Sequence, residues 1–344
     1  MAAGRRISLG LMFLMVCAPV LRGQEGFERY SRSELHMGVE FEVVLYASDP
    51  QLAEAAISQA MTRIAALDKV LSDYDPDSEL SKLSESSVVS GPEKEGPFPV
   101  IQLSDDLWTV LAESERISRR SDGAFDVTIG PLTKLWRRAR RWKELPEAEA
   151  LATARRAVGY QNLVLDSKGR TAHLMRPSMR IDLGGIAKGF AADEAVKTVV
   201  AAGVPRVLAR ASGDIAAADP PPGERGWRIG IAPLEPDQPP SQFVEIANRG
   251  ISTSGDARQH LVVDGRRYSH IIDPRSGECV SGRSSVTIIA PNAMRADGLA
   301  TAASVLGSEK AQALCATFEG VELMMVSESE AGVQQTVKSP GFGR

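Results

Sequence analysis

The chain of 344 residues is poor in the residues that most directly indicate a function. Aromatic residues make up 5% of it, and it has only three cysteines and four histidines. The low aromatic content provides no evident stacking platform for single-stranded nucleic acid. The formal net charge of −4 argues against a sequence-independent nucleic-acid binder, which needs a basic face, so we expect no nucleic-acid partner. Because the cysteines form no CxxC pair, a thiolate zinc site is not expected either.

The N-terminus has the layout of a secretory signal. Two arginines precede an apolar run from Leu9 to Val20, and Gly23 follows shortly after it. The run is shorter than the about 20 residues of a membrane span. We predict a signal over residues 1–23 and a protein that is exported, either periplasmic or on the outer face of the inner membrane. Membrane association through the N-terminus, by an uncleaved anchor or by a lipid on Cys17, remains the alternative.

Two cysteines, Cys279 and Cys315, remain after the signal. They permit one disulfide, but the sequence does not show that they meet in space. The length of the chain allows a sizeable core that needs no disulfide. We therefore favour two mostly buried thiols and leave the disulfide open.

Hydrophobic periodicity predicts an alternation of helices and strands. Helical spacing of apolar residues favours helices over 51–71, from 104 through 117, and over 146–158, 186–202, 296–306 and 308–318. Alternating or short apolar runs favour strands at 39–46, 163–165, 172–175, 179–183, 206–211, 227–231, 243–246, 261–263, 267–272 and 285–289. A segment rich in Ser, Gly and Pro over 81–99 is expected to be a loop. The mixed order of elements favours an α+β fold over a doubly wound sheet.

The strongest local motif runs from Ile181 to Phe190. It begins with the acid Asp182, continues through a glycine pair that permits a tight turn, and ends in an expected helix start carrying Lys188. Amides at a helix start together with a lysine one turn further on suit a phosphate or pyrophosphate. The glycine spacing is not that of a Walker loop. An ordinary strand–turn–helix corner is the alternative.

Two further segments carry candidate chemistry. His270 lies at an expected strand end with Asp273 close behind it, which suits a proton acceptor, although a lone histidine is more often structural. Asp297 and Thr301 are four residues apart at an expected helix start and project to one side, where their oxygens suit magnesium. The alternative is an ordinary acid and a threonine that bonds back into its helix.

Two loops complete the set of motifs. The segment from Asp122 to Leu132 places small residues around two acids and one aromatic residue. Tyr74 lies in an Asp- and Pro-rich loop, where its ring is placed to cover a planar ligand. Each segment taken alone is also explained by residues that simply favour turns.

Taken together, these motifs resemble the ApbE family, the FAD:protein FMN transferases. The resemblance covers roughly Leu35 to Gly320 and includes, in family order, the segments at 36–38, 74–76, 123–128, 182–189, 212–215, 252–255, 268–274 and 296–301. It implies a mixed sheet-and-helix fold related to the T-fold, with the cofactor in a central cleft. Because the motifs are spread along the chain and are expected to converge on one cofactor, we predict a single catalytic domain over 24–344.

The resemblance also implies an activity. Members of the family use FAD as substrate, with Mg²⁺, to move FMN onto a threonine or serine hydroxyl of a target protein, an electron-transfer protein, and they release AMP. Carried over by motif, the FAD contacts are Met37, Tyr74, Ala124, Phe125, Asp126, Asp182, Lys188 and Ile271. The metal ligands are a main-chain oxygen near Gly185 together with Asp297, Ala300 and Thr301. His270 is the candidate base for the incoming hydroxyl, and Asp273 is expected to orient it.

Two positions depart from the family pattern. Ser212 stands where the family usually has glycine, and Val39 stands where threonine is common. A pocket altered in this way would favour hydrolysis of FAD to FMN and AMP over transfer. A metal-dependent FAD pyrophosphatase is therefore one alternative function, and an exported flavin-binding protein without catalysis is the other.

Overall fold

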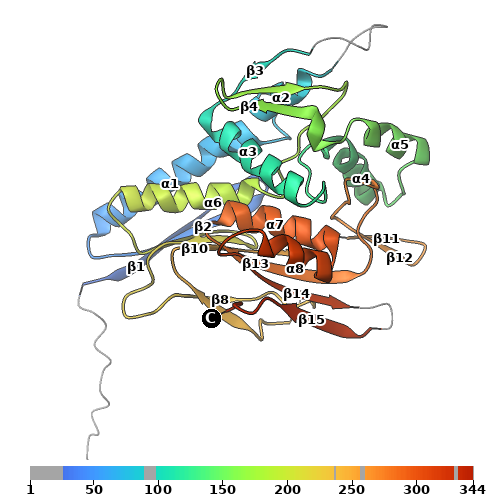
Figure 1. Cartoon of the computed structure of the whole chain (residues 1–344). Helices are drawn as coiled ribbons and strands as arrows, with labels where there is room; N and C mark the ends of the chain where they lie inside the picture. Colours follow the sequence, from blue (N-terminus) through green and yellow to red (C-terminus); the bar gives the residue numbers. More distant parts are fainter. Residues whose placement is uncertain (1–25, 89–97, 236–237, 256–259, 329–331, 344) are drawn as a thin grey trace, which may run out of the picture.

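The centre of the fold is an eight-stranded sheet in which every pair of neighbouring strands is antiparallel (Figure 1). The computed structural model describes residues 26–88, 98–235, 238–255, 260–328 and 332–343, so the predicted signal and Cys17 lie outside it. In spatial order the strands are β1 (Glu28–His36), β2 (Val39–Ala47), β6 (Val207–Ala211), β7 (Asp214–Ala217), β10 (Arg249–Gly255), β13 (Arg283–Ala290), β14 (Glu322–Glu328) and β15 (Gln334–Lys338).

Helices cover one face of this sheet, and a small hairpin lies against the other (Figure 1). The helices are α1 (Pro50–Leu71), α6 (Ala187–Ala201), α7 (Ala293–Leu306) and α8 (Ser308–Ala316), and the hairpin is formed by β8 (Trp227–Gly230) and β9 (Phe243–Ile246). Successive side chains of β2 point to opposite faces of the sheet and so belong to two different hydrophobic cores. Val43 and Leu45 pack with the helices, whereas Val44 packs with Trp227 under the hairpin.

A second group of elements lies beyond the helical layer. It contains the small sheet β3 (Ile101–Gln102), β5 (Thr171–Leu174) and β4 (Leu163–Asp166), the short helix η1 (Tyr160–Asn162), and the helices α2 (Glu79–Glu85), α3 (Asp105–Arg120), α4 (Gly130–Trp142) and α5 (Ala148–Arg156). The hairpin of β11 (His260–Val263) and β12 (Arg266–Ser269) packs against α4, where the rings of Trp136 and Tyr268 are 5.7 Å apart.

The sequence correctly predicted the α+β class and most of the longer elements. The helix expected over 51–71 is α1, whose first turn is capped by the Asp49 carboxylate accepting from the amides of Gln51 and Leu52. The helix expected from 104 is α3, where the Ser104 hydroxyl accepts from the amide of Leu107. Neither Cys279 nor Cys315 forms a disulfide, and Cys315 is buried as favoured.

Several predicted elements were wrong in extent or kind. Helix α7 begins at Ala293 rather than at 296, so Asp297 lies in its second turn. Residues 81–85 of the expected loop belong to α2, which begins with Ser78 as its cap, while 89–97 lie outside the described residues. The segment 179–183 is not a strand, because its amides bond to other partners: Ile181 to the Ser84 hydroxyl and Asp182 to the Val127 carbonyl. The strand expected over 267–272 ends at Ser269.

Helices α6 and α7 approach each other closely through a glycine. A Cβ atom at Gly189 would lie 2.3 Å from the carbonyl oxygen of Ala293. This contact fixes the relative position of the two helices, and thereby of the candidate site residues that they carry. The Asp193 carboxylate of α6 adds to it by accepting from the amides of Ala293 and Met294, both at 2.8 Å.

We expect Gly189→Ala to lower the free energy of unfolding by about 1–3 kcal/mol, because the methyl group must push the two helices apart. Urea denaturation followed by circular dichroism measures this. The matched control is Lys197→Ala on the exposed side of α6, which should change stability by less than about 0.5 kcal/mol. Equal stabilities for the two variants would contradict the close packing.

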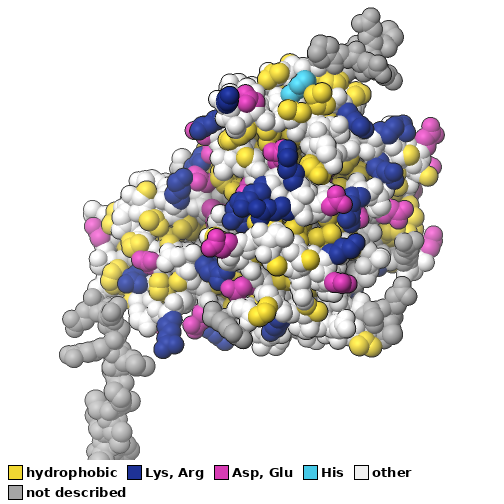
Figure 2. Space-filling model, in the orientation of Figure 1, with side chains coloured by type: hydrophobic (Ala, Val, Ile, Leu, Met, Phe, Trp, Pro, Cys, Tyr) yellow, Lys and Arg dark blue, Asp and Glu magenta, His cyan; other side chains and the backbone are white. Residues whose placement is uncertain are grey.

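Figure 2 shows basic and acidic side chains interspersed over one face of the molecule. Three arginines, Arg116, Arg120 and Arg295, lie around the ring of Phe318. None of the described helices has the length and apolar character needed to cross a membrane.

Candidate active site

The chain between Asp182 and Lys188 connects two groups of charged side chains. The Asp182 carboxylate accepts from the amide of Gly184 at 2.8 Å, which shapes the turn before α6. Lys188 lies in the first turn of α6, and its ammonium donates to the carbonyl oxygen of Gly184 at 3.2 Å. One end of this segment therefore belongs to a cluster around Lys188 and the other to a network around Asp182.

The cluster around Lys188 brings together three separate elements. Its Nζ lies 2.8 Å from Asp214 Oδ2 at the start of β7 and 3.4 Å from Asp297 Oδ2 of α7. Asp297 Oδ2 also accepts from the Gly189 amide at 3.2 Å. The Ser252 hydroxyl of β10 donates to Asp214 Oδ1 at 2.6 Å. The two carboxylates are almost fully buried, and 23% of the lysine side chain is exposed.

Burial shapes the charges of this cluster. It raises the pKa of Asp297 to about 7, and the neighbouring Asp214 carboxylate adds to the rise, while Lys188 and the Gly189 amide oppose it. Burial alone would lower the pKa of Lys188, but the two carboxylates outweigh it and the pKa is raised. Lys188 is therefore positively charged at neutral pH. Asp297, with its raised pKa, needs a further positive group nearby to stay fully ionised.

The Thr301 hydroxyl is not used within its own helix. It makes no hydrogen bond to another described residue, whereas Ser304, three residues later, bonds back to the Ala300 carbonyl at 2.8 Å. Gly185 lies directly against Thr301, because a Cβ atom at position 185 would be 2.9 Å from Thr301 Oγ1. The hydroxyl is thus available beside the glycine turn, as a metal ligand at this position requires.

The donor set near Lys188 fits a magnesium ion. Asp297 supplies a carboxylate, Thr301 a hydroxyl, and the glycine turn main-chain carbonyls, all of them hard oxygen donors. The described residues contain no cluster of three or more His, Cys, Asp or Glu side chains that suits a metal. A cation at this position would therefore be held by one carboxylate, by neutral oxygens and by the phosphates of a molecule bound to the protein. Mg²⁺ is commonly held in this way.

A cavity of about 490 Å³ opens onto this cluster. Four of the predicted site residues line it: Lys188, His270, Asp297 and Thr301. Asp273 is not among its lining residues; both of its carboxylate oxygens accept from the Arg275 guanidinium, and this contact lowers the pKa of Asp273 although burial acts to raise it. The orienting role of Asp273 stays a prediction.

The network around Asp182 lies on the other side of the glycine turn. Asp182 Oδ2 accepts from Arg137 at 2.8 Å and from the Thr133 hydroxyl at 2.7 Å. Arg137 also binds Asp73 and lies 4.7 Å from the centre of the Tyr74 ring. Burial and the nearby Asp182 raise the pKa of Asp73, against the opposing effect of Arg137. Arg137 thus holds the Tyr74 loop against α4.

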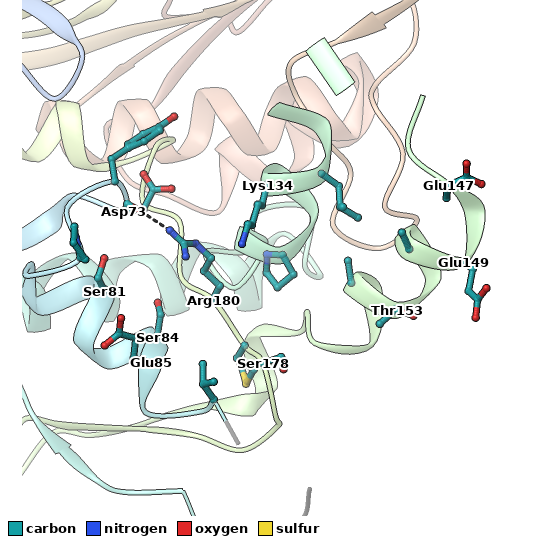
Figure 3. Close-up of a pocket in the computed structure, with 18 residues that line it drawn as sticks. Asp73, Ser81, Ser84, Glu85, Lys134, Glu147, Glu149, Thr153, Ser178 and Arg180 are labelled. Atoms are coloured by element: carbon teal, nitrogen blue, oxygen red, sulfur yellow. Dashed lines mark hydrogen bonds between the residues drawn. The ribbon is translucent and has the colours of Figure 1, made fainter. Parts of the chain in front are cut away.

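A larger cavity of about 1060 Å³ lies beyond this network (Figure 3). Lys134 and Arg180 line it on one side and Glu149 of α5 on another, and Arg180 donates to the Asp73 carbonyl. Of the predicted FAD residues, only the exposed Tyr74 lines it. Lys188, His270, Asp297 and Thr301 line the smaller cavity instead.

The other predicted FAD residues, Met37, Ala124, Phe125, Asp126 and Ile271, line neither of these two cavities. Ala124 and Phe125 are buried, and the Asp126 carboxylate is satisfied internally by Thr128 and by the Tyr160 amide. Burial raises the pKa of Asp126, against these bonds. Met37 lies in the tight turn between β1 and β2, with its amide donating to Asp68, and Ile271 follows β12 and is buried. Their contacts with FAD stay predictions.

The prediction of site residues missed two charged groups. Asp214 contacts Lys188 directly, and Arg137 bridges Asp73 and Asp182. Asp214 stands in the Ser-Gly-Asp segment at 212–214, where the hairpin turn between β6 and β7 places Ser212 at φ 57°. That motif was a usable signal for Asp214. For Arg137 the sequence offered only one arginine among several on α4.

A half-buried lysine, two buried carboxylates and a glycine turn at a helix start face one cavity of this α+β fold, an arrangement that suits a phosphorylated ligand. A family model described as "ApbE family" matches residues 37–325, and the chain belongs to this family.

Curated relatives and solved structures agree with this placement. The FAD:protein FMN transferase of Klebsiella pneumoniae (strain 342) is 31% identical over 312 residues, 89% of this chain and 86% of that protein. The protein of the same name from Treponema pallidum (strain Nichols) is 30% identical over 335 residues, 92% and 90% of the two chains. The apo crystal structure of Pseudomonas stutzeri flavinyl transferase ApbE superposes with a TM-score of 0.77 at 31% identity, covering 92% and 96%.

Proposed function

We propose that the protein transfers FMN from FAD to a threonine or serine hydroxyl of a target protein, with Mg²⁺, and releases AMP. The observation that carries this proposal is the single cavity that collects Lys188, His270, Asp297 and Thr301 in a chain of this family. Its relatives from Klebsiella pneumoniae and Treponema pallidum are named FAD:protein FMN transferase, which supports the reaction. An electron-transfer protein is the proposed acceptor.

The proposed reaction is a displacement at phosphorus. The acceptor oxygen forms a bond to the FMN phosphorus, the bond from that phosphorus to the bridging pyrophosphate oxygen breaks, and AMP leaves with the bonding pair. His270 lines the cavity, and we propose it as the base that takes the proton of the hydroxyl. Lys188 offers a fixed positive charge to the phosphate oxygens. Asp214, which accepts from the Ser252 hydroxyl, holds the lysine in place.

Asp297, Thr301 and the glycine turn would hold the magnesium ion. When bound, the ion neutralises charge that develops on the phosphate oxygens. The oxygen-rich donor set and the unused Thr301 hydroxyl support this assignment.

The reaction is tested by incubating the protein with FAD, Mg²⁺ and a threonine-containing acceptor. We expect a covalent flavin on the acceptor, seen as a fluorescent band and a mass increase of one FMN less one water, with AMP released in equal amount. Release of AMP and FMN at the same rate with and without acceptor would support the pyrophosphatase instead. Binding of FAD with no turnover would support the non-catalytic flavin binder.

Replacing Thr301 separates a ligand role from a structural one. We expect Thr301→Val to weaken the apparent affinity for Mg²⁺ and to lower turnover by about ten- to a hundredfold, because the hydroxyl is lost, while Thr301→Ser retains both. Stability should change by less than about 0.5 kcal/mol in both variants, since the hydroxyl bonds to no other described residue. Magnesium titration and thermal unfolding measure the two effects, and wild-type magnesium dependence in Thr301→Val would contradict the ligand role.

We also propose that the chain is exported, because of its N-terminal basic and apolar segment. Fractionation of cells that express the full chain tests this, and recovery of the protein with uncut residues 1–23 in the cytoplasm would contradict it.

A further inference from the structure

A groove on the far face of the main sheet leads to the candidate active site. Its cavity measures about 700 Å³. The floor is formed by apolar residues of the sheet, including Val44, Leu208 and Ile251, and one wall by the β8–β9 hairpin with Trp227 and Phe243. The hairpin covers only part of this face, and Phe243 is 44% exposed. We refer to these residues, with the three arginines described below, as the sheet-face groove.

The groove is continuous with the active-site cavity. The two share the lining residues Ser212, Gly213, Gly230, Ala232, Pro240 and Thr253. The passage between them therefore crosses the β6–β7 turn, next to Asp214 and the lysine cluster. None of the predicted FAD residues, all of which are described, lines the groove, and Met37 and Phe125 pack with the core on the opposite, helix-covered face.

This arrangement suits the second substrate of a transfer reaction. In a displacement at phosphorus the attacking and leaving oxygens lie roughly in line on opposite sides of the phosphorus. If FAD is held from the helix-covered face and the glycine turn, the acceptor hydroxyl must arrive from another direction. The sheet-face groove supplies such an entrance.

The charge of the groove indicates what kind of segment it takes. Three arginines line it, and Glu42 is the one carboxylate among its described lining residues. Glu42 binds Arg210 at 2.6 Å and lies 3.9 Å from Arg29. The guanidinium of Arg228 lies 3.5 Å from the centre of the Phe243 ring. One carboxylate against three guanidinium groups leaves the groove with an excess of positive charge.

Building on the proposed transferase function, we infer that the sheet-face groove docks an extended segment of the acceptor protein that carries acidic residues beside its flavin-accepting hydroxyl. The acidic side chains lie against Arg29 and Arg228, apolar side chains lie on the sheet, and the hydroxyl passes Ser212 and Gly213 into the cavity. Such charge pairing selects the partner as well as adding affinity.

Two fluorescent peptides test this docking. Both contain one threonine; one is flanked by Asp and Glu, and the other has Asn and Gln in their place. Binding is measured by anisotropy to the full chain loaded with FAD and without Mg²⁺, so that no turnover occurs. We expect the wild type to bind the acidic peptide about tenfold more tightly, and the variant Arg29→Glu/Arg228→Glu to lose this preference.

The matched control is Arg225→Glu, which changes another exposed arginine three residues before Arg228 that does not line the groove. It should keep the preference, and FAD affinity should be the same in all three proteins. Equal binding of both peptides by the wild type, or an equal loss in the control, overturns the docking site. If binding depends on charge but no flavin is transferred after Mg²⁺ is added, the docking site is supported and the transferase function is contradicted. If the double variant transfers flavin to the acidic peptide as well as the wild type does, the transferase function is supported and the docking site is contradicted.

Discussion

Replacing Asp297 with asparagine should lower magnesium-dependent turnover of FAD by about a thousandfold while leaving FAD binding within a few fold. The substitution keeps the size of the side chain and an oxygen that accepts from the Gly189 amide, so the α6–α7 contact survives. It removes the one carboxylate among the proposed ligands, and a lost metal contact of several kcal/mol corresponds to this factor. AMP release and quenching of flavin fluorescence measure the two quantities.

The matched control is Asp264→Asn, an exposed acid in the turn between β11 and β12. Its backbone has φ 50°, a conformation that asparagine tolerates well, so the variant should behave as the wild type. Turnover of Asp297→Asn at the wild-type rate and with the same magnesium dependence would overturn the metal assignment. A loss of FAD binding equal to the loss of turnover would instead assign Asp297 to the nucleotide.

Replacing Lys188 with methionine should destabilise the metal-free protein by about 3–5 kcal/mol, because it leaves Asp214 and Asp297 buried together without their cation. The loss depends on pH. The folded pKa of Asp297, about 7 with the lysine present, lies above that of an unfolded aspartate. Protonation therefore favours the folded state, and stability falls as the pH rises from about 4 through that folded value. In Lys188→Met the folded pKa rises further, so the stability loss should be larger at pH 8 than at pH 6.

Urea denaturation in the presence of a chelator at the two pH values measures this effect. The double variant Lys188→Met/Asp214→Asn removes one of the two carboxylates and should recover a large part of the stability. A stability loss in Lys188→Met that is the same at both pH values, or no recovery in the double variant, would show that the lysine does not hold the two acids together.

The sequence predicted those parts of the fold that local patterns control. The apolar spacing of α1 and the serine cap of α3 were visible without the structure, because periodicity and caps are properties of neighbouring residues. Helix α4 and the strands β1, β3, β7, β10, β14 and β15 escaped notice. The residues of these strands pair with partners distant in sequence or lie exposed at a sheet edge, where alternation is weak. On β1, for example, five of the nine residues are polar or charged and exposed, and they lie on both faces of the strand.

The same distinction applies to the site. Lys188, Asp297 and Thr301 were predicted from motifs, and the structure brings them to one cavity. The contact of Lys188 with Asp214 depends on how β7 sits beside the helices, which only the folded chain shows. For Asp126 the structure shows its carboxylate accepting from the backbone amides of Thr128 and Tyr160, and the FAD contact that its motif predicts stays a prediction.

The strand order of the main sheet has a consequence for how the protein folds. β2 pairs with β6 along a register that joins Phe41 to Ala211, and the five helices α1 to α5, the small sheet and α6 all lie between them in the chain. Pairing at such a separation is slow, because a long loop must close before the contacts form. Asp214 and Asp297 follow later still in the chain. After dilution from denaturant we expect the helical circular dichroism signal to return first, and the ability to bind FAD to recover in a separate, slower phase.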